Sequence, residues 1–351
     1  MAHTKVWNIN IDQPAWQQDL AEAAAQLSAG EQVAFPTETV YGLGGDATSD
    51  EVVRGIFAAK GRPADNPLIV HIYDRQQLDG LVVKVEELAV RLMDAFWPGP
   101  LTIIMPVKPN ALSMYVTAGL STVGVRMPDH PVALELMRQA DVPVAAPSAN
   151  TSGRPSPTTA AHVYQDLQDK IAGIVDAGAT GVGLESTVVE LLDGDTIAIL
   201  RPGGVTVEQL QACCPHAKVI VENAQENIQA PRAPGMKYTH YAPQGELTIV
   251  KGDDDAVASY IEEQLAKAAA YRCGVLCFEH QLHRYQDAEL VISLGSASQL
   301  GQAASRLYDA LRKFDEHNIQ YIWSEASEST GLGAALMNRL LKAAGHTMIE
   351  I

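Results

Sequence analysis

Two stretches of the chain place small polar side chains just past an expected strand. The apolar strand expected at 33–35 stops at a proline and leads into the turn TET at 37–39, since proline cannot donate to a strand ladder. The strand expected at 142–146 leads into PSANTSGRPSP, which carries Ser148 and Asn150. Because open α/β sheets hold ligands at the carboxyl ends of their strands, these groups indicate a polar binding site without an evident nucleophile.

Two cations lie near the first of these turns in sequence. Thr48 and Glu51 have capping-box spacing and predict a helix that ends at Gly61, with Lys60 and Arg62 at its exit. This places both cations within reach of the TET turn. The alternative is that the cations only complement the helix C-terminus, where positive charge is favourable.

A third cation and a histidine lie inside expected strands. Arg126, in the strand expected at 121–127, has apolar neighbours and follows Gly124 by two residues, which suggests a planar clamp for a carboxylate or phosphate. The alternative is an edge-strand arginine facing water. His71 lies in the strand expected at 68–72, where a lone histidine is usually a satisfied core side chain.

Ser156 and Pro157 form a cap followed by a first-turn proline, which predicts a helix at 158–167. Backbone amides at such a helix start form a ready phosphate site. Turn and cap chemistry alone is the alternative for every residue in this loop.

Composition limits the function classes. The 351 residues carry a net charge of −17, and the charge is −11 over 1–221 and −6 over 222–351, so strong nonspecific nucleic-acid binding is not expected. No stretch approaches the roughly 20 apolar residues of a membrane span, and no secretory signal is visible at the start. The four cysteines are too few and too poorly spaced for a disulfide framework or a zinc site. A cytoplasmic location fits best.

The pattern of elements predicts an α/β protein of two domains. An opening helix at 12–29 precedes the first strand, and alternating strands and helices continue through a first domain at 1–221. Residues 222–244 lack periodicity, which predicts a linker. Because this linker contains aromatic and basic residues, we expect the segment to lie across a neighbouring pocket. Residues 245–351 form a smaller alternating α/β domain with a mostly parallel sheet.

Seven ordered blocks resemble the long form of the YrdC-like family, the L-threonylcarbamoyladenylate synthases. They are PTETVYGLGGDA, KGRPADNPLIVHI, FWPGPLT, STVGVRMP, PSANTSGRPSPT, ESTVVE and RPGG. The linker segment APGMKYTHYAP resembles the family's interdomain loop, and the C-terminal part more loosely resembles its accessory domain. The resemblance implies a YrdC-like twisted open α/β sheet with a deep pocket, plus a smaller Rossmann-like domain.

The resemblance also implies site residues. The family tetrad Lys-x-Arg with Ser-x-Asn falls on four residues that would hold ATP's phosphates and the adenylate, and the first two would be catalytic: Lys60, Arg62, Ser148 and Asn150. Further nucleotide positions match Asn66, Thr122, Ser156, Arg201 and Tyr241. Positions on L-threonine and its carbamate match Thr39, His71, Arg126 and Ser186.

The implied reaction joins L-threonine, bicarbonate (or CO2) and ATP into threonylcarbamoyl-AMP and releases pyrophosphate. Mg2+ would accompany ATP, with no protein ligand identifiable and no tightly bound organic cofactor. A separate tRNA threonylcarbamoyl transferase complex would use the product beside the anticodon. One alternative is an RNA-binding module, which the acidic balance disfavours. Another is a hydrogenase-maturation carbamoyltransferase, whose paired Cys-x-x-Cys motifs are absent from this chain.

Overall fold

The computed structural model describes residues 3–222 and 241–351 and shows an α/β protein. The chain divides into two compact units. The first unit comprises residues 1–152 and 157–238, and the second comprises residues 153–156 and 239–351. Of the linker expected at 222–244, residues 223–240 lie outside the described residues. In the described part of the chain, no helix is long and apolar enough to cross a membrane.

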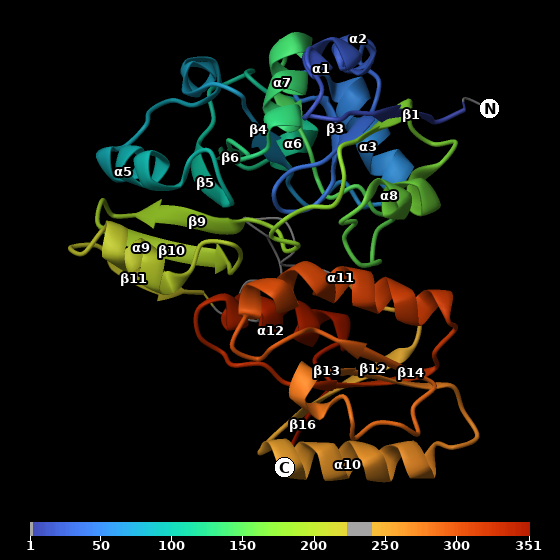
Figure 1. Cartoon of the computed structure of the whole chain (residues 1–351). Coiled ribbons are helices and arrows are strands. Elements are labelled where there is room, and N and C mark those ends of the chain that lie inside the picture. The colour runs from blue at the N-terminus through green and yellow to red at the C-terminus, as the bar shows by residue number, and fades with distance from the viewer. Residues whose placement is uncertain (1–2, 223–240) are drawn as a thin grey trace. The chain divides into compact units, whose positions relative to one another are not determined.

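The first unit is built on an 11-stranded mixed sheet (Figure 1) with the order β1-β8-β2-β3-β7-β4-β6-β5-β9-β10-β11. Its strands are β1 Lys5–Asn8, β2 Val33–Phe35, β3 Gly42–Asp46, β4 Ile69–His71, β5 Leu101–Pro106, β6 Thr122–Arg126, β7 Val144–Ala145, β8 Gly173–Asp176, β9 Thr187–Leu192, β10 Thr196–Arg201 and β11 Lys218–Val221.

The helices of this unit, with one 3-10 turn, are α1 Trp16–Asp19, α2 Ala21–Ser28, α3 Asp50–Lys60, η1 Arg75–Gln77, α4 Leu78–Leu81, α5 Glu87–Phe96, α6 Met114–Thr117, α7 Pro131–Ala140, α8 Ala160–Leu167 and α9 Val207–Cys213. Alternate residues of β2 enter different apolar cores. Ala34 joins the core that includes α3, α5 and α8, whereas Val33 and Phe35 join the core with α2 and α7. Helices therefore cover both faces of the sheet.

The second unit contains a five-stranded sheet in which every described strand pair is parallel. Its order is β14-β13-β15-β12-β16, with β12 Glu246–Lys251, β13 Cys273–Cys277, β14 Leu290–Ser293, β15 Tyr321–Glu325 and β16 Met348–Glu350. Helix α10 (Asp254–Lys267) covers one face, and α11 (Leu300–Glu316) and α12 (Leu332–Ala343) cover the other (Figure 1). A 3-10 turn, η2, spans Glu279–Gln281.

Three local expectations were wrong at helix starts. The side chain that caps α3 is Ser49, which accepts from the Val52 amide at 3.4 Å, whereas Thr48 donates to Asp46. Helix α8 begins at Ala160 behind the cap Thr159, so Ser156 and Pro157 precede the helix rather than open it. The opening helix is broken at Leu20 into α1 and α2.

The glycines after the TET turn belong to a strand. Residues 42–46 form strand β3, paired antiparallel with both β2 and β7. A Cβ at Gly44 would lie 2.7 Å from Phe35 Cε1 and 2.9 Å from Val144 Cγ1. The glycines therefore permit neighbouring side chains to pack over this strand.

Candidate active site

Two functional candidates lie side by side at one end of the central strands. Strands β4 and β6 are parallel, and His71 is in register with Arg126. Strand β6 lies between β4 and β5 inside the sheet, and Arg126 is 4% exposed. Arg126 is therefore not an edge residue facing water, and the buried guanidinium has the position expected of a clamp.

The guanidinium of Arg126 is held by three oxygen atoms. Nη1 donates to Thr39 Oγ1 at 2.9 Å, Nε donates to the Gly99 carbonyl at 3.2 Å, and Nη2 lies 2.5 Å from Glu38 Oε2 in an ion pair. The TET turn therefore meets Arg126, and Glu38 is a functional candidate to which sequence reasoning gave no role beyond membership of that turn. The sequence feature that could have identified Glu38 is its position next to Thr39, which was expected to bind threonine.

The TET turn is fixed by its own hydroxyl and by a distant loop. Thr37 Oγ1 accepts from the amides of Thr39 at 3.1 Å and Val40 at 3.3 Å, a local side-chain turn typical of threonine. The amides of Val182 and Gly183 donate to the carbonyls of Glu38 and Thr39 at 2.7 and 3.0 Å. These bonds hold the Glu38 and Thr39 side chains in place beside Arg126.

His71 is buried, with 4% exposure, and its ring packs edge-on against Phe35 at 6.4 Å. Burial, and then the charge of Arg126, lower the pKa of His71 to about 3, so the imidazole is neutral near pH 7. Its Nδ1 has no hydrogen-bond partner among the described residues. A satisfied core histidine would have one, which favours a role toward a ligand.

Ser186 and Arg201 are joined to the same end of the sheet. Ser186 Oγ shares a hydrogen bond of 2.8 Å with Thr102 Oγ1, and Arg201 Nη2 donates to the Ser186 carbonyl at 3.0 Å. The pairing of β5 with β6 places Thr102 opposite Arg126, one residue before the Ile103–Val125 pair. The structure thus brings Thr39, His71, Arg126 and Ser186 to one region, with Arg201 beside them.

The remaining cations lie at the other end of strand β4. Helix α3 ends at Gly61, which has φ 61° as expected. Lys60 Nζ, in a residue 2% exposed, donates to the carbonyls of Ser148 and Asn150, the latter at 2.6 Å. Ser148 Oγ in turn donates to Asn150 Oδ1 at 2.6 Å. Three of the four residues of the family tetrad, Lys60, Ser148 and Asn150, are therefore joined by hydrogen bonds in this loop.

Arg62 contacts the segment that enters β4. Its Nη2 donates to the carbonyls of Asn66 and Pro67, both at 3.3 Å. Asn66 is fully buried, yet neither atom of its side-chain amide has a hydrogen-bond partner among the described residues. Register places Thr122 beside Pro67, two residues before the Ile69–Gly124 pair. Arg62, Asn66 and Thr122 thus occupy one neighbourhood.

Strand pairing also fixes how the two ends relate. Strand β7 runs antiparallel to β4, with Ala145 opposite Val70, so the chain after β7 runs toward the Pro67 end, and Ser148 lies there. Four residues separate Pro67 from His71, which corresponds to about 13 Å of extended strand. The two polar groups lie at opposite ends of this short strand, and the segment from the TET turn to β3 joins them, because Thr39 contacts Arg126 while Gly42 pairs with Ser148.

Two of the expected nucleotide residues belong to the second unit. Segment Gly153–Ser156 is held there by the Ala242 amide, which donates to Gly153 O at 3.0 Å, and by Arg312, which donates to Pro155 O at 2.6 Å. Tyr241 packs on Tyr308 with ring centroids 5.2 Å apart and under the guanidinium of Arg339. These contacts describe Ser156 and Tyr241 within their own unit.

No group of three or more His, Cys, Asp or Glu residues is arranged to hold a metal ion within residues 3–222 and 241–351. The oxygen donors near Lys60 are hydroxyl and amide groups. The carbonyl oxygens of Ser148 and Asn150 accept hydrogen bonds from Lys60 Nζ, and Asn150 Oδ1 accepts one from Ser148 Oγ.

Known proteins resemble this chain over both of its domains. The Sua5, YciO and YrdC family model, described as telomere recombination, matches residues 25–203, and the model for the threonylcarbamoyl-AMP synthase C-terminal domain matches 205–345. The threonylcarbamoyl-AMP synthases of Bacillus subtilis and Pyrococcus abyssi are 50% and 42% identical to this chain, over 99% and 98% of its length and 99% of theirs. A crystal structure of P. abyssi Sua5 complexed with L-threonine matches with a TM-score of 0.92 and 41% identity, and the match covers 99% of this chain and 100% of that one. This chain therefore belongs to the threonylcarbamoyl-AMP synthase family, with both of its domains.

Proposed function

We propose that this protein makes threonylcarbamoyl-AMP from L-threonine, bicarbonate (or CO2) and ATP, with release of pyrophosphate. The observation that carries the proposal is the pair of polar ends on strand β4. One end holds a buried Arg126 beside the Thr39 hydroxyl, and a guanidinium suits an amino-acid carboxylate. The other gathers Lys60, Arg62 and the Ser148–Asn150 loop, which suits phosphates.

The chemistry needs these groups and no nucleophile from the protein. Threonine's amine takes up carbon dioxide to form a carbamate, and a carbamate oxygen attacks the α-phosphorus of ATP while pyrophosphate leaves. Such a displacement depends on aligned reactants and on donors aimed at the developing charge. Buried side chains also protect a fragile carbamate and anhydride from water.

The residue roles follow the family positions. ATP would be held by Lys60, Arg62, Asn66, Thr122, Ser148, Asn150, Ser156, Arg201 and Tyr241. L-Threonine would be held by Thr39, His71, Arg126 and Ser186. The buried Asn66 amide and the His71 Nδ1, both without partners among the described residues, support these roles because an unsatisfied buried polar group is costly unless a ligand completes it.

Mg2+ would arrive with ATP, and it would neutralise charge on the phosphates. This role needs few ligands from the protein, since magnesium in nucleotide sites is bound largely by phosphates and water. The residues of this chain would then hold the nucleotide itself, through Lys60 and Arg62 and the loop at Ser148 and Asn150.

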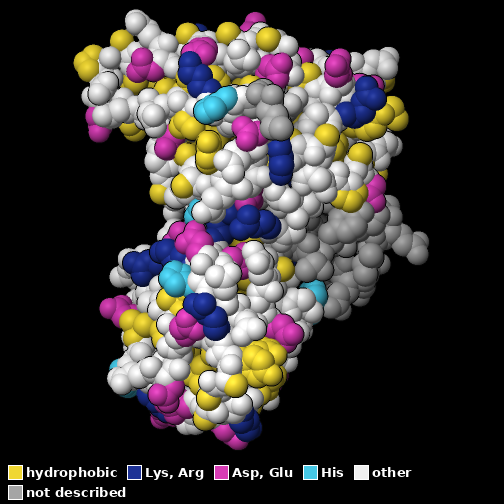
Figure 2. Space-filling view, turned by 90° about the vertical axis from the view of Figure 1, so that its right-hand side faces the viewer, with side chains coloured by type: hydrophobic (Ala, Val, Ile, Leu, Met, Phe, Trp, Pro, Cys, Tyr) yellow, Lys and Arg dark blue, Asp and Glu magenta, His cyan; other side chains and the backbone are white. Residues whose placement is uncertain are grey.

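The product would pass to a separate tRNA threonylcarbamoyl transferase complex, with little direct nucleic-acid binding by this chain. On the face shown in Figure 2, Lys and Arg side chains are interspersed with Asp and Glu, which supports the expectation from net charge. We also propose a cytoplasmic location, which the four free thiols support: Cys213, Cys214, Cys273 and Cys277.

Pyrophosphate release tests the function directly. The purified chain, with ATP, Mg2+ and bicarbonate, should release pyrophosphate when L-threonine is added and not when glycine replaces it. Mass spectrometry should detect threonylcarbamoyl-AMP. Pyrophosphate release that is indifferent to the amino acid would reject the assignment, and tight binding of tRNA at physiological salt would favour the RNA-binding alternative.

A further inference from the structure

Glu38 is an internal carboxylate beside Arg126, and its contact is incomplete. Its Oε2 lies 2.5 Å from Arg126 Nη2, in side chains that are 12% and 4% exposed. The two groups are close in distance, yet neither Glu38 oxygen nor Arg126 Nη2 has a well-directed hydrogen-bond partner among the described residues. The ion pair is thus held by charge and burial, and it leaves hydrogen-bonding positions on both partners.

A threonine zwitterion has the chemistry to fill those positions. Its carboxylate matches the fork of Arg126, and its ammonium group needs an acceptor close by. The other groups that contact Arg126 are the Thr39 hydroxyl and the Gly99 carbonyl, and they carry no charge. If the zwitterion bound between Glu38 and Arg126, its ammonium group would pair with Glu38 and its carboxylate with Arg126. Two ion pairs would then replace one, so the desolvation of Glu38 and Arg126 would be better compensated when the substrate is bound.

The ammonium group must then lose protons. With bicarbonate, R–NH3+ and HCO3− give R–NH–COO−, one water and one proton. A nitrogen–carbon bond forms with the nitrogen's lone pair, a carbon–oxygen bond breaks to give the water, and the remaining proton must go to a base. This step precedes attack on ATP and needs no oxidant or reductant.

The groups near this position differ in charge. Burial, and then the charge of Arg126, lower the pKa of His71 to about 3, so its imidazole is neutral near pH 7. Burial also lowers the pKa of His130, and the charges of Glu38 and Asp129 counteract this effect. Glu38 is the carboxylate that lies against the guanidinium of Arg126, so it is the anionic group here that would pair with an ammonium ion and could take a proton from it.

We propose that Glu38 receives the ammonium group of L-threonine and accepts the proton released when that amine becomes the carbamate. The proposal rests on the proposed function of the site and assigns a further catalytic residue to it. Arg126 would orient the substrate carboxylate, and the hydrogen bonds from Val182 and Gly183 to the TET turn would keep Glu38 in position.

The test compares Glu38→Gln with the wild-type protein across pH. Glutamine keeps the shape and loses the proton acceptor, so threonine-dependent pyrophosphate release at pH 7 should fall by about 100-fold or more, with the KM for ATP unchanged. As pH rises toward the pKa of the free amine, more threonine enters already deprotonated. The ratio of wild-type to variant rate should therefore shrink by up to about tenfold per pH unit.

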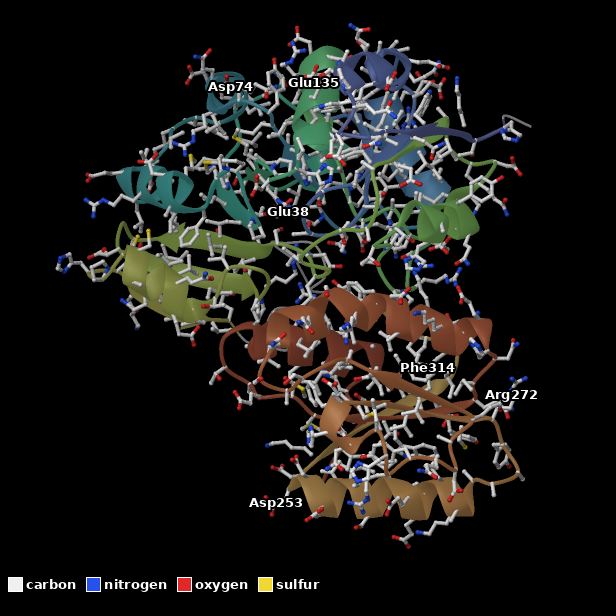
Figure 3. All side chains as sticks on the ribbon, viewed as in Figure 1. Glu38, Asp74, Glu135, Asp253, Arg272 and Phe314 are labelled. Carbon is white, nitrogen blue, oxygen red and sulfur yellow. The ribbon has the colours of Figure 1, made fainter. Side chains whose placement is uncertain are left out.

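A matched variant and a conservative variant complete the design. Glu135→Gln removes a carboxylate from helix α7, where Glu135 pairs with Arg138, and it should behave as wild type; Figure 3 labels both glutamates. Glu38→Asp keeps the acceptor on a shorter side chain and should recover part of the rate. If Glu38→Gln does not fold, the pH profile of Glu38→Asp tests the proposal instead. The ratio of wild-type to Glu38→Asp rate should also decrease as pH rises, because the shorter side chain holds the base away from the amine.

The outcomes separate this proposal from the function itself. Absence of threonine-dependent pyrophosphate release by the wild-type protein would reject the function. An active wild type with an equally active Glu38→Gln variant would overturn the role of Glu38. A rate deficit that stays constant from pH 7 to 9 would also overturn it, because a purely structural defect does not depend on the protonation of threonine.

Discussion

Glu38 in the first unit and Glu325 in the second are both buried carboxylates at strand ends or turns, and they differ in how their oxygens are used. Glu325, 6% exposed at the end of β15, accepts from the Phe278 amide at 2.8 Å and from the Tyr285 hydroxyl at 2.6 Å. Glu38 has an ion pair with Arg126 and no well-directed hydrogen bond among the described residues.

This difference in hydrogen bonding indicates that Glu325 has a structural role and that Glu38 is positioned to bind a ligand. Both Glu325 oxygens are satisfied within the unit, so its burial needs no further partner. Glu38, His71 and Asn66 leave polar atoms unsatisfied among the described residues, and all three lie around strand β4. We therefore expect substitutions in the first region to change activity and substitutions at Glu325 to change stability.

The largest effect should come from the cations at the Pro67 end of β4. In the proposed function, Lys60→Ala and Arg62→Ala would each remove a donor for charge that develops during the displacement, and such a loss typically costs about 100- to 1000-fold in rate. The measurement is pyrophosphate release per folded molecule. Arg272→Ala, which breaks an exposed ion pair with Glu289 in the second unit, is the control and should leave the rate unchanged. A Lys60 or Arg62 variant that unfolds while keeping its activity per folded molecule would make that residue structural.

A smaller effect should separate threonine from serine at the His71 end. The two substrates differ by one methyl group, which a pocket discriminates by about 1–3 kcal/mol, or about 10- to 200-fold in kcat/KM. Competition of the two amino acids for product formation, read by mass spectrometry, measures the ratio. Equal incorporation would show that this end of the site recognises only the shared backbone groups.

Glu325 should give the opposite result to Glu38. Glu325→Ala leaves the Phe278 amide and the Tyr285 hydroxyl without their acceptor, which should lower the free energy of unfolding by about 1–3 kcal/mol. Urea denaturation measures that loss, and kcat/KM of the folded variant should equal the wild-type value. A loss of activity without a loss of stability would erase the contrast between the two carboxylates.

The two regions should also differ in the sign of their pH dependence. His71 has a pKa lowered to about 3 by burial and by Arg126, so below its ordinary value of 6.5 the unfolded chain binds more protons than the native one. Its contribution to stability is present above pH 6.5 and is lost as pH falls toward 3. In a His71→Asn variant, the unfolding free energy should therefore fall less steeply over this range.

Glu325 shows the reverse sign. Burial raises its pKa above 4.5, against the lowering effect of its hydrogen bonds from Phe278 and Tyr285, so the native chain binds more protons once pH exceeds 4.5. Its contribution therefore falls as pH rises from 4.5 through the raised pKa, and Glu325→Gln should flatten that part of the stability curve. Identical curves for wild type and variant would contradict the shift.

Much of the fold could be predicted because the periodic pattern of apolar residues indicates strands and helices even where the exact caps and ends are uncertain from sequence. The expected strand at 33–35 and the helix exit at Gly61 match the structure. Strand β3 could not be predicted, since its glycines have little intrinsic strand preference and the strand exists because β2 and β7 pair with it on both sides. The caps at Ser49 and Thr159 were missed because neighbouring hydroxyls, Thr48 and Ser156, fit the same patterns.

The sequence by itself determined the chemical inventory of this protein: cations, hydroxyls and amides after strands, with no metal-binding cluster of cysteines, and seven ordered blocks of one family. Only the tertiary structure decided which of these groups meet. Pairing among β4, β6 and β7 joins residues that are up to 75 positions apart, and it places His71 beside Arg126 while the chain after β7 runs toward the other end of β4. It also decided that Glu38 faces Arg126, because a carboxylate's partner is set by register and burial, which no local pattern records.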